Sequence, residues 1–346
     1  MLECAVDNLE LIGKTEIKLR ATVLVTGGAG YIGSHNVKYL RNRGHEVVVL
    51  DDLSGGFADA VPAGCLTEGN VGDSTLLDRI FCEHAISVVM NFASFIEVGA
   101  SVKDPSSYYQ NNVGNTLVLL DAMVRHGVRH FVFSSTAAIF GNPEYSPIDE
   151  GHPKAPINPY GRSKWVVEQL LQDYASAYGL ESVCLRYFNA AGADPAGKLG
   201  ERHEPETHLI PLVLQAASGR RDSITIFGND YDTEDGTCVR DYIHVEDLAQ
   251  AHWLALKYLE KYEKSAAFNL GNGNGYSIRQ VIGTTREVTG REFPVEHGPR
   301  RPGDPPVLVA DSRRAKAELG WRPEYSKLDE IIRHAWTWEQ KKGEFW

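Results

Sequence analysis

The run YGRSK (160–164) places the phenol of Tyr160 and the ammonium of Lys164 four residues apart, and therefore on one face if the run is helical. A nearby cation stabilises a phenolate, which lowers the pKa of a tyrosine from about 10 toward the working range of a general base. Taken alone, the spacing is explained better by a surface pair than by a catalytic one. Upstream, Ser134-Ser135-Thr136 ends a predicted strand and brings hydroxyl groups that such a site could use.

A glycine-rich run, TGGAGYIG (26–33), lies between the predicted strand Thr22–Thr26 and the predicted helix Ser34–Arg43. This order is typical of a dinucleotide-binding loop. Gly27 permits the tight turn, Gly30 lets the backbone approach a pyrophosphate, and Gly33 lets the helix pack closely on the strand. The spacing is GxxGxxG rather than GxGxxG, so a glycine-rich turn without a ligand is the alternative interpretation.

An acidic residue follows this loop at the position where a dinucleotide site needs one. Asp51 ends the second predicted strand, and its carboxylate could accept hydrogen bonds from ribose hydroxyls while repelling a 2′-phosphate. The sequence therefore favours NAD over NADP. Asp52, beside it, is equally well explained as a helix cap or a loop acid.

Short β-branched runs alternate with amphipathic runs in the first half of the chain. The predicted strands are Thr22–Thr26, Glu46–Leu50, Ser87–Phe92 and His130–Ser134, and the clearest helices are Ser34–Arg43 and Val113–His126. Continuous apolar strands that alternate with helices predict a parallel sheet covered on both faces. The expected fold class is α/β, with a Rossmann-type doubly wound parallel sheet.

The residue composition changes after residues 186–190. Gly, Pro, Asp and Glu become frequent in two segments, 196–211 and 228–237, which is typical of loops. Helical patterns return at Val245–Leu259 and Lys327–Lys342, which predicts a smaller mixed α/β substrate-binding domain. We expect an N-terminal extension over 1–20 with no role in the chemistry. The dinucleotide-binding domain should span 21–188 with a return segment near 236–260, and the substrate domain should span mainly 189–346.

Composition excludes several classes of protein. The 346 residues carry a formal net charge of −11, which has the wrong sign for sequence-independent nucleic-acid binding. No apolar run approaches the ~18 residues of a membrane span, and the N-terminus lacks the pattern of a signal peptide, so we expect a cytoplasmic protein without a membrane partner. The five cysteines include no CxxC pair, and the sequence has no HExxH motif, so we expect neither disulfides nor a metal site. His203 and His208 are interpreted as loop or pocket residues.

The order of TGGAGYIG, FSST (133–136) and YGRSK resembles the extended short-chain dehydrogenase/reductase family. Further blocks resemble the UDP-sugar epimerases of that family, and the resemblance runs from about residue 21 to the C-terminus. These blocks are NNVGNT (111–116), LRYFN (185–189), HEPETHLIP (203–211), DGTCVRDYIHV (235–245) and RRPGD (300–304). They are more specific than the glycine loop.

The resemblance implies an enzyme that interconverts UDP-glucose and UDP-galactose with tightly bound NAD, which is reduced and reoxidised in each turnover. Tyr160 would take the proton of the sugar 4-hydroxyl, and Thr136 would hydrogen-bond the reacting oxygen. Lys164 would hold the nicotinamide ribose and lower the pKa of Tyr160. The 4-keto sugar would then rotate about its link to the diphosphate and receive the hydride on its other face.

The resemblance also implies which residues bind the two ligands. The cofactor residues are Gly27, Gly30, Tyr31, Ile32, Gly33, Asp51, Asp52, Leu53, Ser54, Asn70, Val71, Phe92, Ala93, Ser94, Asn111, Thr136, Tyr160, Lys164 and Phe188. The UDP-sugar residues are Asn189, His208, Leu209, Phe227, Arg240, Arg301, Asp304 and Leu308. Arg240 and Arg301 would neutralise the diphosphate, and the alternative for Arg240 is a structural ion pair with Asp241.

Three positions depart from relatives in this family. Asn70 replaces a common Asp, Ile96 replaces a lysine near the cofactor, and Leu308 lies where relatives carry tyrosine or smaller residues. Leu308 leaves the use of N-acetylated sugars open.

Competing functions differ in how well the residues support them. A 4,6-dehydratase or a decarboxylase needs an acid after the catalytic threonine, but Ala137 and Ala138 follow Thr136. A 4-epimerase of UDP-GlcNAc/GalNAc, UDP-xylose/arabinose or UDP-glucuronate remains open, as does a non-catalytic NAD-binding regulator. The resemblance also suggests a homodimer, in which Val113–His126 could form part of the contact.

Overall fold

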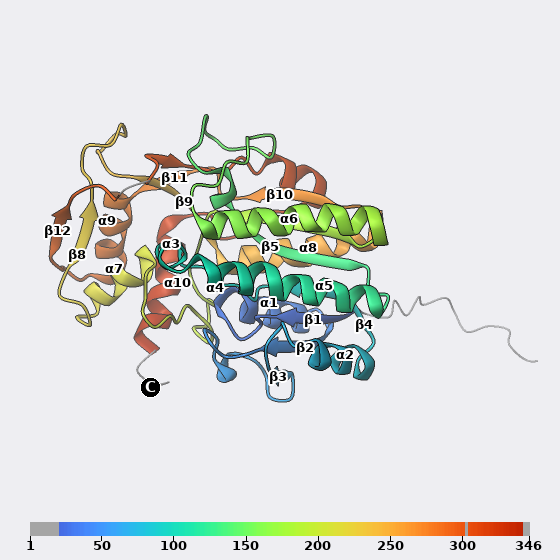
Figure 1. The fold of residues 1–346 in the computed structure, drawn as a ribbon. Coiled ribbons are helices and arrows are strands. Elements are labelled where there is room, and N and C mark those ends of the chain that lie inside the picture. The colour runs from blue at the N-terminus through green and yellow to red at the C-terminus, as the bar shows by residue number, and fades with distance from the viewer. Residues whose placement is uncertain (1–20, 302–303, 342–346) are drawn as a thin grey trace, which may run out of the picture.

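A seven-stranded parallel sheet forms the larger part of the structure, a computed structural model that describes residues 21–301 and 304–341 (Figure 1). Its strands run in the order β10-β6-β5-β4-β1-β2-β3, and every neighbouring pair is parallel. They are β1 (Thr22–Thr26), β2 (Glu46–Asp51), β3 (Leu66–Glu68), β4 (Ile86–Asn91), β5 (His130–Thr136), β6 (Glu181–Tyr187) and β10 (Ala266–Leu270). The predicted doubly wound α/β fold is confirmed.

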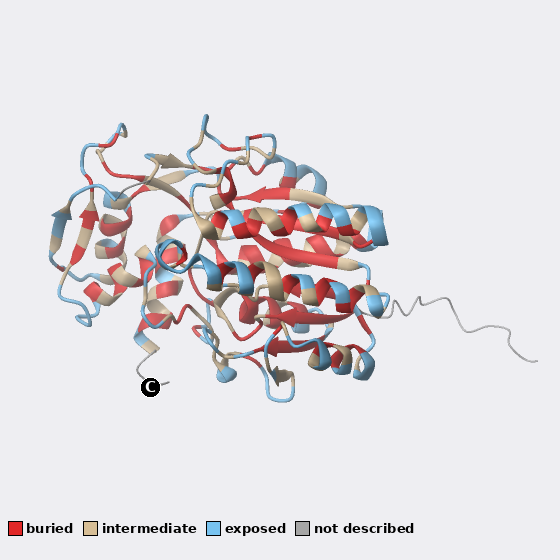
Figure 2. Cartoon of the chain, viewed as in Figure 1, coloured by how far each residue is buried: buried red, intermediate tan, exposed pale blue. Residues whose placement is uncertain are grey.

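Helices cover both faces of this sheet, because successive side chains of each strand point to opposite sides. Val23 and Val25 of β1 lie in one core and Leu24 lies in the other. The first core is covered by α1 (Tyr31–Asn42) and α8 (Val245–Tyr262), and the second by α2 (Ser74–Glu83), α5 (Asn115–Arg125) and α6 (Pro159–Tyr178). Figure 2 shows the central strands largely buried, and the helices buried on the side that faces the sheet and exposed on the other.

Several element boundaries differ from the sequence predictions. Helix α1 begins at Tyr31 rather than Ser34, because Gly30 is its extended cap residue and accepts the first helical bond from the Ser34 N–H at 2.9 Å. Strand β10 joins the edge of the large sheet from far along the chain, and no strand was predicted there. Helix α8 runs to Tyr262, beyond the predicted end at Leu259.

The predicted helix Val113–His126 is the later part of a longer helical run. The longer run comes after α3 (Val98–Lys103). It consists of α4 (Pro105–Tyr109), a wider helical turn at Gln110–Gly114, and α5. This run lies beside α6 on the outer face of the sheet (Figure 1).

The smaller part contains α7 (Leu209–Ala217), α9 (Ile278–Thr289) and α10 (Leu328–Lys341) around two small apolar cores. Strands β8 (Ile224–Phe227) and β12 (Val295–Gly298) pair in parallel. Strand β9 (Val239–His244) pairs with β7 (Asn189–Ala191), β11 (Gly275–Ser277) and β13 (Val307–Leu308). This mixed α/β part agrees with the predicted class, while the proposed domain boundaries stay a prediction.

Short helical turns occupy Ala58–Ala60, Ala137–Phe140 and Ala315–Leu319. The predicted extension over 1–20 and the last residue of the predicted helix Lys327–Lys342 lie outside the described residues. Within the described ranges, no helix is long and apolar enough to cross a membrane. The four cysteines found there, residues 65, 82, 184 and 238, are all free thiols.

Candidate active site

One cavity of about 1320 Å³ opens at the carboxyl ends of the large sheet and extends into the smaller part. This is the edge where open parallel sheets bind ligands. Its volume exceeds the ~300–1,000 Å³ of a typical single-ligand pocket, which leaves room for two ligands. Every residue that the sequence assigned to cofactor, catalysis or UDP-sugar lines this cavity. The structure thus brings the predicted set together, while the individual roles remain predictions.

The glycine loop forms one wall of the cavity and depends on glycine at two positions. Gly27 has φ +71°, and a Cβ there would lie 2.4 Å from the Ala93 nitrogen. A Cβ on Gly33 would lie 2.1 Å from the Gly27 oxygen. At Gly30, by contrast, the nearest atom to an added Cβ is 3.4 Å away, so the backbone there is open to the cavity. This surface fits the close approach of a dinucleotide pyrophosphate.

Asp51 is fixed at the end of β2 by backbone donors. Its Oδ2 accepts a hydrogen bond from the Ala29 N–H at 2.8 Å, and its Oδ1 accepts one from the Leu53 N–H at 2.9 Å. Burial raises the pKa of this carboxyl, and the two N–H donors oppose that shift. Each oxygen keeps a lone pair for a ribose hydroxyl, so the carboxylate fits the predicted NAD contact.

Amide side chains form the adjoining part of the wall. The Asn70 amide donates to Asp52 Oδ2 at 2.9 Å, and its Oδ1 accepts from the Gly72 N–H at 2.8 Å. The Asn115 amide bridges Asn70 and Asn111, with 3.1 Å to each side-chain oxygen. Asn70 and Asn111 are therefore held in place by partners that the sequence did not indicate.

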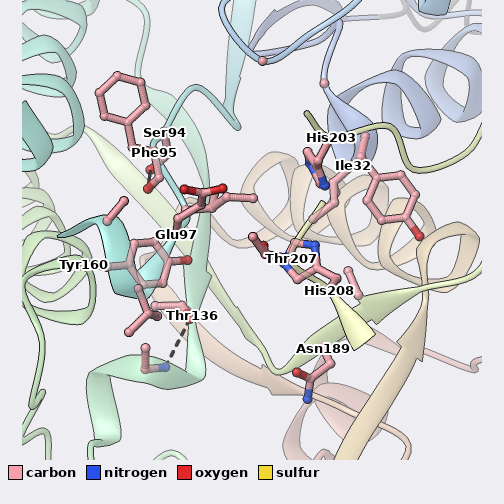
Figure 3. A pocket seen from close by; sticks show the side chains of 18 of the residues that line it. Ile32, Ser94, Phe95, Glu97, Thr136, Tyr160, Asn189, His203, Thr207 and His208 are labelled. Carbon is pink, nitrogen blue, oxygen red and sulfur yellow. Dashed lines mark hydrogen bonds between the residues drawn. The ribbon is translucent and has the colours of Figure 1, made fainter. Parts of the chain in front are cut away.

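Two elements position the predicted catalytic side chains. Helix α6 carries Tyr160 and Lys164, and its first turn is capped by Asn158, which accepts from the Gly161 N–H at 2.8 Å. Thr136 ends β5, and its Oγ1 accepts from the Ala138 N–H at 3.1 Å. Figure 3 shows Tyr160 and Thr136 side by side at the same wall of the cavity. The predicted helix and strand end at this site are confirmed.

The electrostatics of this wall differ from the sequence expectation. Burial raises the pKa of Tyr160 to about 12, and a hydrogen bond with Thr136 opposes the rise. Burial also lowers the pKa of Lys164 to about 7, and its Nζ donates to the Ser134 carbonyl at 2.9 Å. Among the protein's own groups, desolvation therefore outweighs the expected effect of Lys164 on the pKa of Tyr160. Both groups are pushed toward their neutral forms.

The far end of the cavity carries the two predicted arginines. Arg240 donates through Nη1 to the Pro305 carbonyl at 2.9 Å, and its Nη2 lies 3.5 Å from Asp304 Oδ1. The Arg301 guanidinium stacks over the Phe227 ring at 4.0 Å from its centroid. The alternative of an Arg240–Asp241 ion pair is wrong. The Asp241 carboxylate instead accepts hydrogen bonds from the backbone N–H groups of residues 272, 273 and 310.

Three further predicted residues lie between the two ends. Asn189 donates to the Asp241 carbonyl at 3.0 Å, which fixes its amide at the cavity wall. Leu308 and Phe188 pack against the small apolar core beneath the turn that follows Thr136. These three side chains therefore add no charge to the cavity wall.

Sequence reasoning missed a cluster of ligand-type side chains in the loop before α7. Glu201, His203, Glu206 and His208 bring one polar atom each within 4.8 Å of one another. His203 and His208 line the cavity as expected, but their closeness to two carboxylates was not predicted. The available signal was a Glu-x-His pattern that occurs twice within eight residues.

Ion pairing dominates the titration of this cluster. Burial alone would lower the histidine pKa values, but the carboxylates of Glu201 and Glu206 outweigh it and raise the pKa of His203 to about 9 and that of His208 to about 10. Burial would raise the pKa of Glu206, but the two histidines hold it well below its usual range. These side chains are therefore pushed toward their charged forms.

Comparisons with known proteins agree with this site. Residues 23–271, more than half of the chain, match the model of the NAD dependent epimerase/dehydratase family. A UDP-glucose 4-epimerase from Halalkalibacterium halodurans is 52% identical over 92% of this chain and 96% of that protein. A Brucella ovis UDP-glucose 4-epimerase solved with NAD has a TM-score of 0.89 at 50% identity, over 91% of this chain and 97% of that one. A Bifidobacterium longum UDP-glucose 4-epimerase solved with NAD⁺ and UDP has a TM-score of 0.89 at 39% identity, over 94% of this chain and 100% of that one.

Proposed function

The chain belongs to the NAD-dependent epimerase/dehydratase family, and we propose that it interconverts UDP-glucose and UDP-galactose by transient oxidation at sugar C4. The observation that carries this proposal is the single cavity that joins the glycine loop, the Tyr160 wall and the two arginines. The same cavity has room for a dinucleotide and a nucleotide-sugar together.

The cofactor half of the site is the surface around the glycine loop and Asp51. NAD, when bound there, supplies an acceptor and donor of hydride for the sugar carbon. Gly30 leaves the backbone open to the pyrophosphate, and Asp51 takes the ribose hydroxyls. The same carboxylate repels a 2′-phosphate, which selects NAD over NADP.

The catalytic wall moves one proton. Tyr160 accepts the proton of the 4-hydroxyl as the sugar is oxidised and returns it when the ketone is reduced. Thr136 hydrogen-bonds the reacting oxygen and favours the phenolate of Tyr160. Lys164, held by the Ser134 carbonyl, would orient the nicotinamide ribose and, in its protonated form, would stabilise the phenolate against the burial that raises the pKa of Tyr160.

The far end of the cavity holds the substrate through its nucleotide. Arg240 and Arg301 bind the diphosphate, Phe227 and Asp304 face the uridine, and Asn189, His208 and Leu209 complete the contact. A firm grip on the nucleotide and an apolar middle of the cavity let the 4-keto sugar turn over between oxidation and reduction. Inversion at C4 follows from this division.

A 4-epimerase of another UDP-sugar is the second candidate, and Leu308 is the observation that favours it. A leucine beside the sugar leaves more space than a tyrosine would, and that space could accept an N-acetyl group. A non-catalytic regulator is less compatible with a chain that retains Tyr160, Lys164 and Thr136 in one cavity.

Assembly as a homodimer and a cytoplasmic location belong to the same proposal. Exposed apolar side chains on the α3–α5 run, among them Val102, Tyr109 and Leu117, support a contact between two copies. We propose that this run pairs with its copy.

An NMR time course with UDP-galactose, without added cofactor, tests the function. Conversion to UDP-glucose is expected, and parallel samples with UDP-GalNAc, UDP-xylose and UDP-glucuronate rank the alternatives. A protein that contains bound NAD but converts none of these sugars would contradict the proposal and favour the regulator.

A further inference from the structure

The Glu201–His208 loop gathers four potential metal ligands at the rim of the cavity. We call Glu201, His203, Glu206 and His208 the loop cluster. His208 Nδ1 lies 2.6 Å and His203 Nδ1 lies 3.2 Å from Glu201 Oε1, and both nitrogens lie 3.6 Å from Glu206 Oε1. Ligand atoms bound tetrahedrally at about 2.0–2.2 Å from a metal ion are about 3.4 Å apart. The distances of 3.2, 3.6 and 3.6 Å are close to this value, whereas the 2.6 Å contact between His208 Nδ1 and Glu201 Oε1 is a direct ion pair that would lengthen around an ion.

One carboxylate oxygen of the loop cluster lacks a partner although it is buried. The Glu206 side chain is only 3% exposed, and its Oε2 has no hydrogen-bond partner. Its Oε1 is already held by the backbone N–H groups of Thr207 and His208 at 2.9 and 3.0 Å. His203 Nδ1 is also buried, and it faces Glu201 Oε1 at 3.2 Å without an aligned hydrogen bond. Buried polar atoms are normally satisfied, so Glu206 Oε2 points to a missing partner.

The chemistry of the ligand set selects the kind of partner. Two carboxylates balance the charge of a dication, and neutral imidazole with carboxylate suits Zn²⁺ and neighbouring divalent transition metals. Binding of the ion would therefore displace the protons that pair the two histidines with the carboxylates in its absence. We propose that Glu201, His203, Glu206 and His208 bind one divalent transition-metal ion, with Zn²⁺ as the representative. The site does not depend on the proposed epimerase activity.

The position of the loop cluster indicates what the ion would do. Figure 3 shows His203 near Ile32 of α1, on the cofactor side, and His208 nearer to Asn189. His208 is also the residue that caps α7. Four protein ligands close the coordination sphere, which is typical of a structural ion rather than a catalytic one. The ion would therefore fasten the loop between the cofactor half and the substrate half, and leave His208 Nε2 free at the cavity.

Calorimetric titration of untagged, chelator-treated holoenzyme with Zn²⁺ tests the proposal. One ion per chain is expected, and Co²⁺ in its place should give the visible absorption of tetrahedral cobalt. His203→Ala and Glu206→Gln should each weaken Zn²⁺ binding by at least about 10–100-fold, because loss of a ligand should cost no less than loss of an outer-shell partner.

A histidine and a glutamate outside the loop cluster provide the matched control. Glu296 and His297 are exposed neighbours on β12, and the double variant Glu296→Gln/His297→Ala should bind Zn²⁺ like the wild type. Circular dichroism shows which variants are folded. If His203→Ala does not fold, the Zn²⁺ affinity of the isosteric variant Glu206→Gln decides the test. Absence of tight binding to the folded wild type, or equal affinity in the cluster variants and the control, would overturn the proposal.

Discussion

The catalytic wall and the loop cluster face the same cavity, but their environments act on titratable groups in opposite directions. At the wall, burial without an ionic partner raises the pKa of Tyr160 to about 12 and lowers that of Lys164 to about 7. In the loop cluster, opposite charges outweigh burial and raise the pKa of His203 to about 9. The wall therefore disfavours charge, and the loop cluster retains it.

The difference matches two tasks: the catalytic wall transfers a proton, and the loop cluster keeps a loop in one shape. A group that must accept and release a proton works best when neither of its forms is strongly favoured by fixed partners. A loop that must keep its shape benefits from paired charges that satisfy one another. The substrate end resembles the loop cluster, because Arg240 and Arg301 keep a fixed positive charge for the diphosphate.

The largest effect is expected when the proton acceptor of the catalytic wall is removed. Tyr160→Phe removes the proton acceptor and should lower kcat by about 10²–10⁴-fold, while bound NAD and UDP affinity stay near wild type. Steady-state kinetics, with cofactor content measured after gel filtration, check this. Tyr178→Phe is the control on the same helix, since Tyr178 is exposed away from the cavity and should keep full activity. A Tyr160→Phe variant within tenfold of wild-type kcat would remove Tyr160 from its role.

A smaller effect is expected when the fixed charge of the substrate end is removed. Arg301→Gln should weaken UDP binding by about 10–100-fold, because a hydrogen bond to a charged group contributes ~1.5–3 kcal/mol. Titration calorimetry with UDP measures the loss. The neighbouring Arg300 is paired with Asp230 and does not line the cavity, so Arg300→Gln should bind UDP like the wild type. Equal losses in both variants would contradict a specific diphosphate contact.

Thr136→Val should change how kcat depends on pH. The Thr136 hydrogen bond lowers the pKa of Tyr160, so its loss should raise that pKa and leave less phenolate at a given pH. We expect kcat to fall by about 10-fold near neutral pH, and the deficit to shrink as pH rises. A kcat profile against pH measures this, and Thr136→Ser should restore the wild-type profile. A deficit that is constant with pH would show that Thr136 does not act on Tyr160.

The smallest effect concerns the apolar middle of the cavity. Leu308→Tyr fills space beside the sugar and should lower the rate with UDP-GalNAc relative to UDP-galactose by roughly 10-fold or less, a difference typical of steric selection in an apolar pocket. Leu308→Met keeps the volume and should leave the ratio unchanged. Competition between the two sugars, followed by NMR, gives the ratio directly. An unchanged ratio in Leu308→Tyr would place the sugar elsewhere.

The sequence was sufficient to predict the elements that follow local patterns. β1, the glycine loop and α1 follow one another directly in the sequence, so their order could be predicted from local patterns. The four-residue spacing of Tyr160 and Lys164 likewise places both side chains on one face of a helix. Boundaries were less certain: α1 begins three residues early, because Gly30 rather than a polar side chain provides the cap.

Features that depend on distant residues were not predictable in the same way. The place of β10 at the sheet edge depends on β6, more than 80 residues earlier. The pKa of Tyr160 depends on burial, which spacing does not reveal. The loop cluster requires a loop that folds back on itself, so its two Glu-x-His pairs were interpreted separately from any metal site.

The most direct test of the account follows the hydrogen at sugar C4. UDP-galactose carrying deuterium at C4 is incubated in ordinary water with the protein and no added cofactor, and the UDP-glucose formed is analysed by NMR and mass spectrometry. Oxidation and reduction by one cofactor that stays bound predict that the deuterium remains at C4 in the product. Product that carries protium at C4 would show exchange with solvent and would contradict the account.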